Sequence, residues 1–167
     1  MLAYSTSWEK TWTFGHPSVS SHFGMQYFIS FIDDATSWKV VYTLHLKSQV
    51  FKAFKRYEAY TENATGFKMK STQDDKGGEY MSNEWIQFCD DHGIVRRHTV
   101  RNQPQQNGVA DRANRTIIET LTTMLHESHL PLSFWGEALA TFAHVWNCLS
   151  TFTLTGFTPY GPGMVRS

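Results

Sequence analysis

The order in which strand-like and helix-like segments alternate is the feature that most constrains the fold of this chain. Residues 26–32 are aromatic and β-branched, a composition typical of a buried strand. Residues 50–57 instead repeat apolar side chains at helical spacing, and Gly66 ends that segment. The predicted order is a strand within 8–14, strands over 26–32 and 38–46, a helix from 47 to 65, a strand over 67–73, a helix over 83–92, a strand over 94–99, and helices over 109–128 and 132–149. This order predicts an α/β fold with a mixed sheet between helices.

Composition limits the class of protein. The 167 residues suit one domain, and 41% hydrophobic with 15% aromatic residues argues against disorder. Fifteen basic residues balance 15 acidic ones, so any surface that binds nucleic acid has to be local. No apolar run approaches the roughly 18 residues of a membrane span, and Cys89 and Cys148 have no metal-ligand spacing. We therefore expect an intracellular protein with reduced cysteines and no membrane segment.

Two acidic residues fall where a sheet and a helix should meet. Asp75 follows a predicted strand and precedes Gly77, while Asp111 lies in the first turn of the predicted long helix, with 35 residues (76–110) between them. Carboxylates brought about 4–6 Å apart favour a cation between them, and Mg²⁺ or Mn²⁺ prefers such oxygen ligands. The simpler alternative makes Asp75 a turn residue and Asp111 a helix-start charge favoured by the helix dipole.

Arginines cluster beside these acids. Arg96, Arg97 and Arg101 precede the proline-containing loop, and Arg112 and Arg115 lie three residues apart on one helix. Contacts to the DNA phosphate backbone need only such local positive charge. We interpret them as a surface for duplex DNA without sequence preference. Solvated surface arginines with no partner are the alternative.

Four short motifs stand out in the sequence: QDDKGGEY at 73–80, PQQNGVADRANRT at 104–116, YFISFIDD at 27–34 and FWGEA at 134–138. Together they resemble the integrase catalytic core of copia-type LTR retrotransposons. The first two resemble the second and third acidic motifs of the D, D-x35-E arrangement, and together the four matches extend over about 15–160. The resemblance implies a ribonuclease H-like fold, metal-dependent polynucleotidyl transfer for DNA integration in the nucleus, and possible homo-oligomers. It also implies Asp75 and Asp111 as catalytic ligands of Mg²⁺ or Mn²⁺.

The chain departs from the family pattern at two of three acids. The third acid is Asp111 where the family has Glu, a side chain shorter by roughly 1.3–1.5 Å. The first acid belongs to a D-x-x-G-P motif, and the matching stretch over 11–17 has Trp12 or Thr13 at its position. Neither residue supplies a carboxylate, so we expect impaired catalysis.

Three functions follow from these observations. We rank an inactive relic that retains DNA binding first, an active transferase second and a protein-interaction module third; a large exposed aromatic patch on the last helix would favour the third. Within the chain we expect a degraded first strand and loop over 1–25, the catalytic core over 26–150 and a C-terminal extension over 151–167.

Overall fold

A computed structural model describes residues 9–15, 17–33, 38–74, 83–98 and 104–149. At 9–14, 73, 74, 98, 104–111 and 113 it describes the backbone alone.

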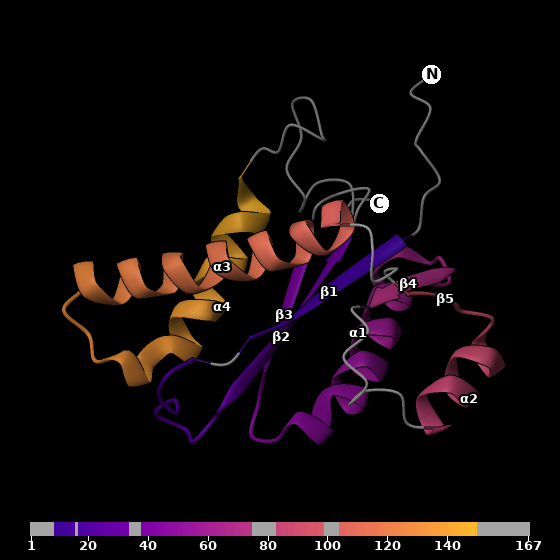
Figure 1. The fold of residues 1–167 in the computed structure, drawn as a ribbon, viewed down its shortest axis with the longest axis horizontal. Coiled ribbons are helices and arrows are strands. Elements are labelled where there is room, and N and C mark those ends of the chain that lie inside the picture. The colour runs from indigo at the N-terminus through magenta and orange to yellow at the C-terminus, as the bar shows by residue number, and fades with distance from the viewer. Residues whose placement is uncertain (1–8, 16, 34–37, 75–82, 99–103, 150–167) are drawn as a thin grey trace.

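A five-stranded sheet with the order β3-β2-β1-β4-β5 forms the centre of the molecule (Figure 1). The strands are β1 (Glu9–Gly15), β2 (Tyr27–Asp33), β3 (Lys39–Leu44), β4 (Ser71–Asp74) and β5 (Val95–His98). β1, β2 and β3 pair antiparallel, whereas β4 pairs parallel with both β1 and β5. The predicted mixed sheet is confirmed, and the strand expected within 8–14 is its middle strand.

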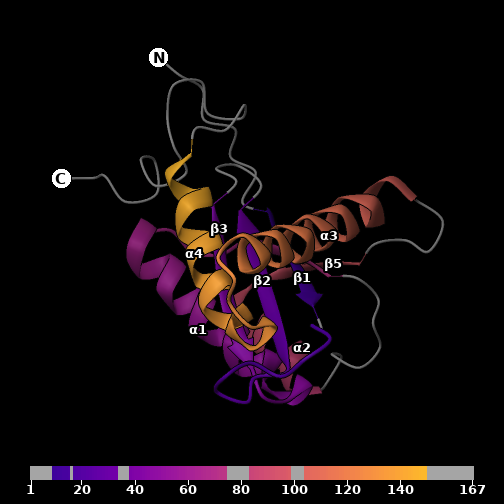
Figure 2. The ribbon, with the colours of Figure 1, turned by 90° about the vertical axis from the view of Figure 1, so that its left-hand side faces the viewer.

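Helices cover both faces of the sheet. α1 and α2 lie on one face, and α3 and α4 on the other, as the two views in Figures 1 and 2 show. The bounds are η1 (Lys47–Gln49), α1 (Val50–Thr65), α2 (Asn83–His92), α3 (Pro104–Glu127), η3 (Leu132–Phe134) and α4 (Trp135–Cys148). α1 and α2 end at Gly66 and Gly93, whose φ of 71° and 66° are left-handed values that glycine adopts without steric cost.

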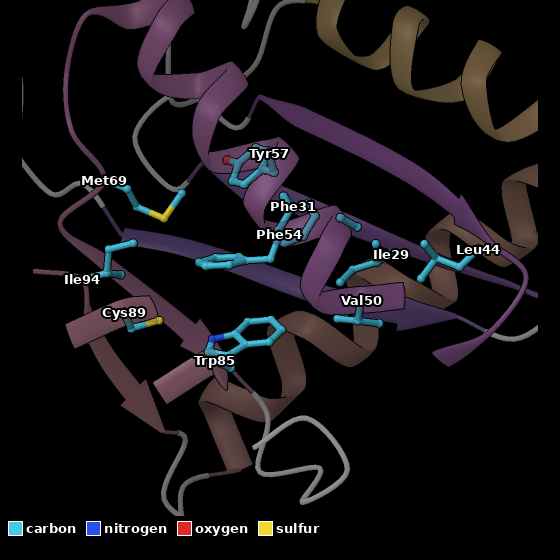
Figure 3. Close-up of a cluster of buried hydrophobic side chains, with 11 residues drawn as sticks. Ile29, Phe31, Leu44, Val50, Phe54, Tyr57, Met69, Trp85, Cys89 and Ile94 are labelled. Atoms are coloured by element: carbon cyan, nitrogen blue, oxygen red, sulfur yellow. The ribbon is translucent and has the colours of Figure 1, made fainter. Parts of the chain in front are cut away.

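Each helical layer has its own hydrophobic core. On the α1–α2 face, Phe31 from β2 stacks on Tyr57 with ring centroids 4.3 Å apart, and Phe54 stacks on Trp85 at 4.7 Å (Figure 3). On the opposite face, Phe28 packs among residues of α3 and α4. Alternate residues of a strand point to opposite faces, so β2 contributes to both cores.

Two predicted boundaries are wrong. α3 begins at Pro104 rather than at Val109, because proline is favoured at the first helical position, where its missing N–H has no partner to lose. β4 begins at Ser71 rather than at Phe67, whose side chain is 45% exposed after the helix-ending Gly66 and has no place in the core.

The aromatic stripe of the last helix is core. Trp135 and Phe142 are buried, and Trp146 packs against the same cluster. The large hydrophobic side chains exposed at the end of this helix are aliphatic, Val145 and Leu149. Along this helix, which the structure describes over 135–148, there is therefore no exposed aromatic patch to support an interaction module. Within the described residues, no helix has the length and apolar character that a membrane crossing requires.

Candidate functional site

Three segments predicted to carry the chemistry come together at the middle of the sheet. β1 is the central strand, β4 is its parallel neighbour, and α3 packs directly against β1. β4 ends at Asp74, the residue before Asp75. The fold thus places β1 and α3, which carry the stretches matched to the first and third acidic motifs, in contact with each other, and β4, which leads into the second motif, beside β1. The carboxyl end of a strand in an open α/β sheet is where such folds bind ligands.

The pairing register distinguishes positions 12 and 13 on β1. Thr13 pairs with Ser30 and Trp12 with Phe31. Phe28 belongs to the core under α3 and α4, and Phe31 to the core under α1 and α2, so alternation along β2 puts Ser30 on the α3 side. Directly paired residues share a face. Position 13 is therefore on the face of the sheet that α3 covers, and position 12 is on the other.

The two remaining acids of the motif are placed only in part. Asp75 lies outside the described residues, and Asp111 is described by its backbone, as the eighth residue of α3 counted from Pro104. The expectation that Asp111 lies in the first helical turn is wrong. Since the helix dipole acts on charges mainly within the first turn, it gives no explanation for an acid at this depth.

Two other acids near the first acidic motif, Glu9 and Asp33, have strand-pairing positions that differ from position 13. Glu9 pairs with Ser71, at the beginning of β4, so it is four positions from Thr13, or roughly 13 Å along the strand. Asp33 pairs with Lys10 and follows the alternation of Phe31, which belongs to the α1–α2 side. Neither position is equivalent to position 13.

The predicted arginines occupy two elements. Arg112 and Arg115 are exposed, one turn apart on α3. Arg97 is exposed on the edge strand β5, whereas its neighbour Arg96 is half-buried. Arg101 lies outside the described residues. Because side chains alternate along a strand, Arg96 and Arg97 are on opposite faces and only one of them can extend the α3 surface.

No group of three or more His, Cys, Asp or Glu side chains among the described residues is placed to hold a metal ion. One buried carboxylate in this part of the chain joins two helices instead. Glu58 of α1 is buried and its Oε1 lies 2.5 Å from Nδ1 of His92, which joins α1 to the end of α2. Motif reading did not identify this pair, because the two residues are 34 positions apart and carry no spacing signal.

Comparison with known proteins finds relatives among the Pol polyproteins of plant transposons. The chain is 46% identical over 133 residues to the retrovirus-related Pol polyprotein from transposon TNT 1-94 of Nicotiana tabacum, covering 80% of this chain and 10% of that protein. It is 30% identical over 142 residues to the corresponding polyprotein from transposon RE1 of Arabidopsis thaliana, covering 85% of this chain. The chain spans about one tenth of the length of these relatives. No protein-family model matches it.

Solved structures agree on the fold. The simian T-cell lymphotropic virus intasome in complex with the PP2A regulatory subunit B56 gamma matches with a TM-score of 0.73 at 15% identity, over 95% of this chain and 54% of that one. The HTLV-2 integrase catalytic core domain in complex with magnesium, in a trimeric form, gives 0.67 at 17%, over 93% and 95%. The BIV integrase catalytic core domain gives 0.66 at 15%, over 92% and 91%. These likenesses show the ribonuclease H-like fold that the motifs implied. With the transposon relatives, they support a copia-type integrase catalytic core for this chain.

Proposed function

We propose that this chain is a catalytically impaired integrase core that still binds duplex DNA without sequence preference. The observation that carries the proposal is the register of β1. The face of this central strand that α3 covers has threonine at position 13, beside the end of β4. A carboxylate is missing at the point where the family's first acid is expected.

The residues present do not fit a two-metal site. A site of this kind distributes its carboxylates over two ions, so the loss of one ligand weakens both. Asp111 is also shorter than glutamate, and Mg²⁺–oxygen distances near ~2.1 Å leave little slack. The register gives neither Glu9 nor Asp33 a position from which to replace the missing ligand. We therefore expect the unmodified chain to lack metal-dependent strand transfer and 3′ processing.

Repair of the site tests this proposal. We expect Thr13→Asp and Asp111→Glu to restore nothing singly and to restore Mn²⁺-dependent nicking of a fluorescent duplex together, since catalytic groups that act as a unit are strongly non-additive. The matched control is Trp12→Asp with Asp111→Glu, which adds the same carboxylate on the opposite face. Circular dichroism checks that each variant folds. Nicking by the unmodified chain that Asp75→Asn abolishes would refute the impaired site.

DNA binding needs fewer features than catalysis. Arg97, Arg112 and Arg115 are exposed cations, and phosphate contacts require local positive charge rather than exact geometry. Arg101 joins them in this proposal by its place in the sequence, and Arg96 contributes less because it is half-buried. Non-specific affinities of this kind are about 10⁻⁴–10⁻⁶ M.

Fluorescence anisotropy with a duplex of arbitrary sequence measures this binding. We expect the affinity to fall steeply with salt, and the double change Arg112→Ala with Arg115→Ala to weaken it and flatten the salt slope by about 2. Arg56→Ala is the matched control, since Arg56 is an exposed arginine on α1, across the sheet. Salt-independent binding, or an equal loss in the control, would contradict this surface.

Further properties follow from the same proposal. We infer a nuclear location, because DNA is the partner, and self-association, because the HTLV-2 core was solved in a trimeric form. We assign 1–25 to the first strand and following loop, 26–150 to the core and 151–167 to a C-terminal extension. Gel filtration with light scattering tests the association, and limited proteolysis tests the boundaries.

A further inference from the structure

The last turn of α4 carries a histidine and a cysteine on one face. His144 and Cys148 are four positions apart in a regular helix, which brings their side chains to the same side of it. Both residues are exposed, and Cys148 is a free thiol. No CxxC-type motif surrounds Cys148, but a helical spacing of four also pairs two metal ligands, so the expectation that Cys148 has no such spacing is wrong.

The two side chains approach each other nearly as two ligands of one ion would. The Sγ atom of Cys148 lies 3.9 Å from Nε2 of His144. Zinc bonds of about 2.3 Å to sulfur and about 2.0–2.1 Å to nitrogen, at a tetrahedral angle, place the two ligand atoms about 3.6 Å apart. Two exposed side chains can close the remaining difference of about 0.3 Å by small changes of their torsion angles.

The direct contact between the two groups is weak. A thiol is a poor donor and a poor acceptor, and 3.9 Å is a long distance for a hydrogen bond to an imidazole nitrogen. An ion between the two atoms would replace this weak contact with two coordination bonds while the helix stays in place.

The donor set selects the kind of ion. Thiolate and imidazole ligands favour Zn²⁺, whereas Mg²⁺ and Mn²⁺ prefer oxygen ligands. Glu137 is the single acid of α4, and it is seven positions before His144, or roughly 10 Å along the helix axis. α4 therefore adds no carboxylate to the pair, and its donors differ in kind from those of the acidic integrase motifs.

We propose that His144 and Cys148 form a Zn²⁺ site at the end of α4, built from none of the residues of the acidic motifs. Binding forms one Zn–N and one Zn–S bond, displaces two waters from the hydrated ion and releases the thiol proton to the buffer. Water occupies the other positions of the ion. Two ligands supply about half of the binding free energy of a four-ligand zinc site, which corresponds to a dissociation constant on the order of 10 µM.

Titration of the reduced, metal-free chain with Cd²⁺ tests this site, because Cd²⁺ binds soft ligands and its bond to a thiolate absorbs in the ultraviolet. We expect the absorption to saturate at one Cd²⁺ per chain, and Zn²⁺ but not millimolar Mg²⁺ to reverse it. The absorption should vanish in Cys148→Ser, since Cys89 is 0% exposed and out of reach of the ion. His144→Ala should lower the affinity at least tenfold, and circular dichroism checks that each variant folds.

Two matched controls separate the pair from a lone ligand. His126→Ala removes an exposed histidine of α3 that has no cysteine four positions away, so the affinity should stay unchanged. Val145→Cys combined with Cys148→Ser keeps one thiol at an exposed position but places it next to His144 in sequence, where the two side chains do not face each other. This double variant should bind at least tenfold more weakly than the unmodified chain.

Three results would overturn the proposal. Equal binding by the double variant, or no loss in His144→Ala, would mean that a lone thiol holds the ion. Saturation at one ion per two chains, with dimers seen by light scattering, would mean that the ion joins two copies instead of closing within one helix. Absence of thiolate absorption at about 1 mM Cd²⁺, roughly 100 times the expected dissociation constant, would mean that the pair does not bind.

Discussion

Replacing Asn147 with alanine removes two hydrogen bonds that join α4 to β3. Asn147 is 5% exposed on α4, and its amide bonds both backbone groups of Lys39, a residue 108 positions earlier on β3. Alanine leaves one N–H and one C=O without these partners at the sheet edge. Each buried polar group that loses its partner costs about 1–3 kcal/mol, and water reaching the edge offsets part of this, so we expect a loss of about 2–4 kcal/mol.

Urea denaturation followed by circular dichroism measures this loss as a change in the free energy of unfolding. In a domain of this size, each kcal/mol of lost unfolding free energy lowers the midpoint of thermal unfolding by about 2–4 °C. This midpoint should therefore fall by about 5–15 °C. Asn63→Ala is the matched control, an exposed asparagine on α1 whose change should stay within ~0.5 kcal/mol. A loss below 1 kcal/mol for Asn147→Ala would show that solvent fully replaces the amide, and the reasoning would fail.

Two further changes test the core and the buried lysine. Gly15→Ala should lower the free energy of unfolding by about 1–3 kcal/mol, because an added Cβ there overlaps the Phe28 ring. At Gly136 in α4 an added Cβ meets only ordinary contacts, so Gly136→Ala should leave the free energy of unfolding unchanged or raise it. Chemical denaturation measures both changes. The pKa of Lys39 is lowered by burial to about 8 from 10.5, so the unfolded chain binds more protons between these values. The free energy of unfolding, taken relative to that of Lys39→Met, should therefore rise by roughly 2 kcal/mol from pH 8 to 10; a difference that does not change with pH contradicts this.

Local sequence signals predicted most of the elements because the same local physics forms them. The run over 26–32 is a strand since its aromatic and β-branched side chains fill both cores. Gly66 and Gly93 end helices because their backbone is left-handed there. The start of α3 was predicted wrongly because the asparagine and glycine at 107 and 108 favour a loop locally, whereas a proline at the first helical position and packing of the helix against β1 favour the earlier start.

Features that depend on sheet order could not be predicted from the sequence. Nothing local indicates that β1 is the central strand, or that Asn147 reaches Lys39 across 108 positions. Whether Trp12 or Thr13 replaces the first acid was open for the same reason. The choice depends on the pairing of β1 with β2, which distinguishes the α3 face from the α1 face. The sequence alone shows that neither position 12 nor position 13 has a carboxylate. It does not show on which face of the sheet each position lies.

The register is also consistent with our proposal that position 13 has lost the family's first acid. Position 13 lies in the central strand opposite Ser30, which is fully buried. A carboxylate in such a place is stable only with a cation, because burial and neighbouring acids both disfavour its charged form. Threonine is a good strand former and carries no charge. We therefore expect Thr13→Asp to lower the unfolding free energy in metal-free buffer, and Mn²⁺ to recover it only when Asp111→Glu is also present. Recovery by Mn²⁺ in the single variant, seen as a higher unfolding temperature, would mean that Asp111 is long enough to share the ion.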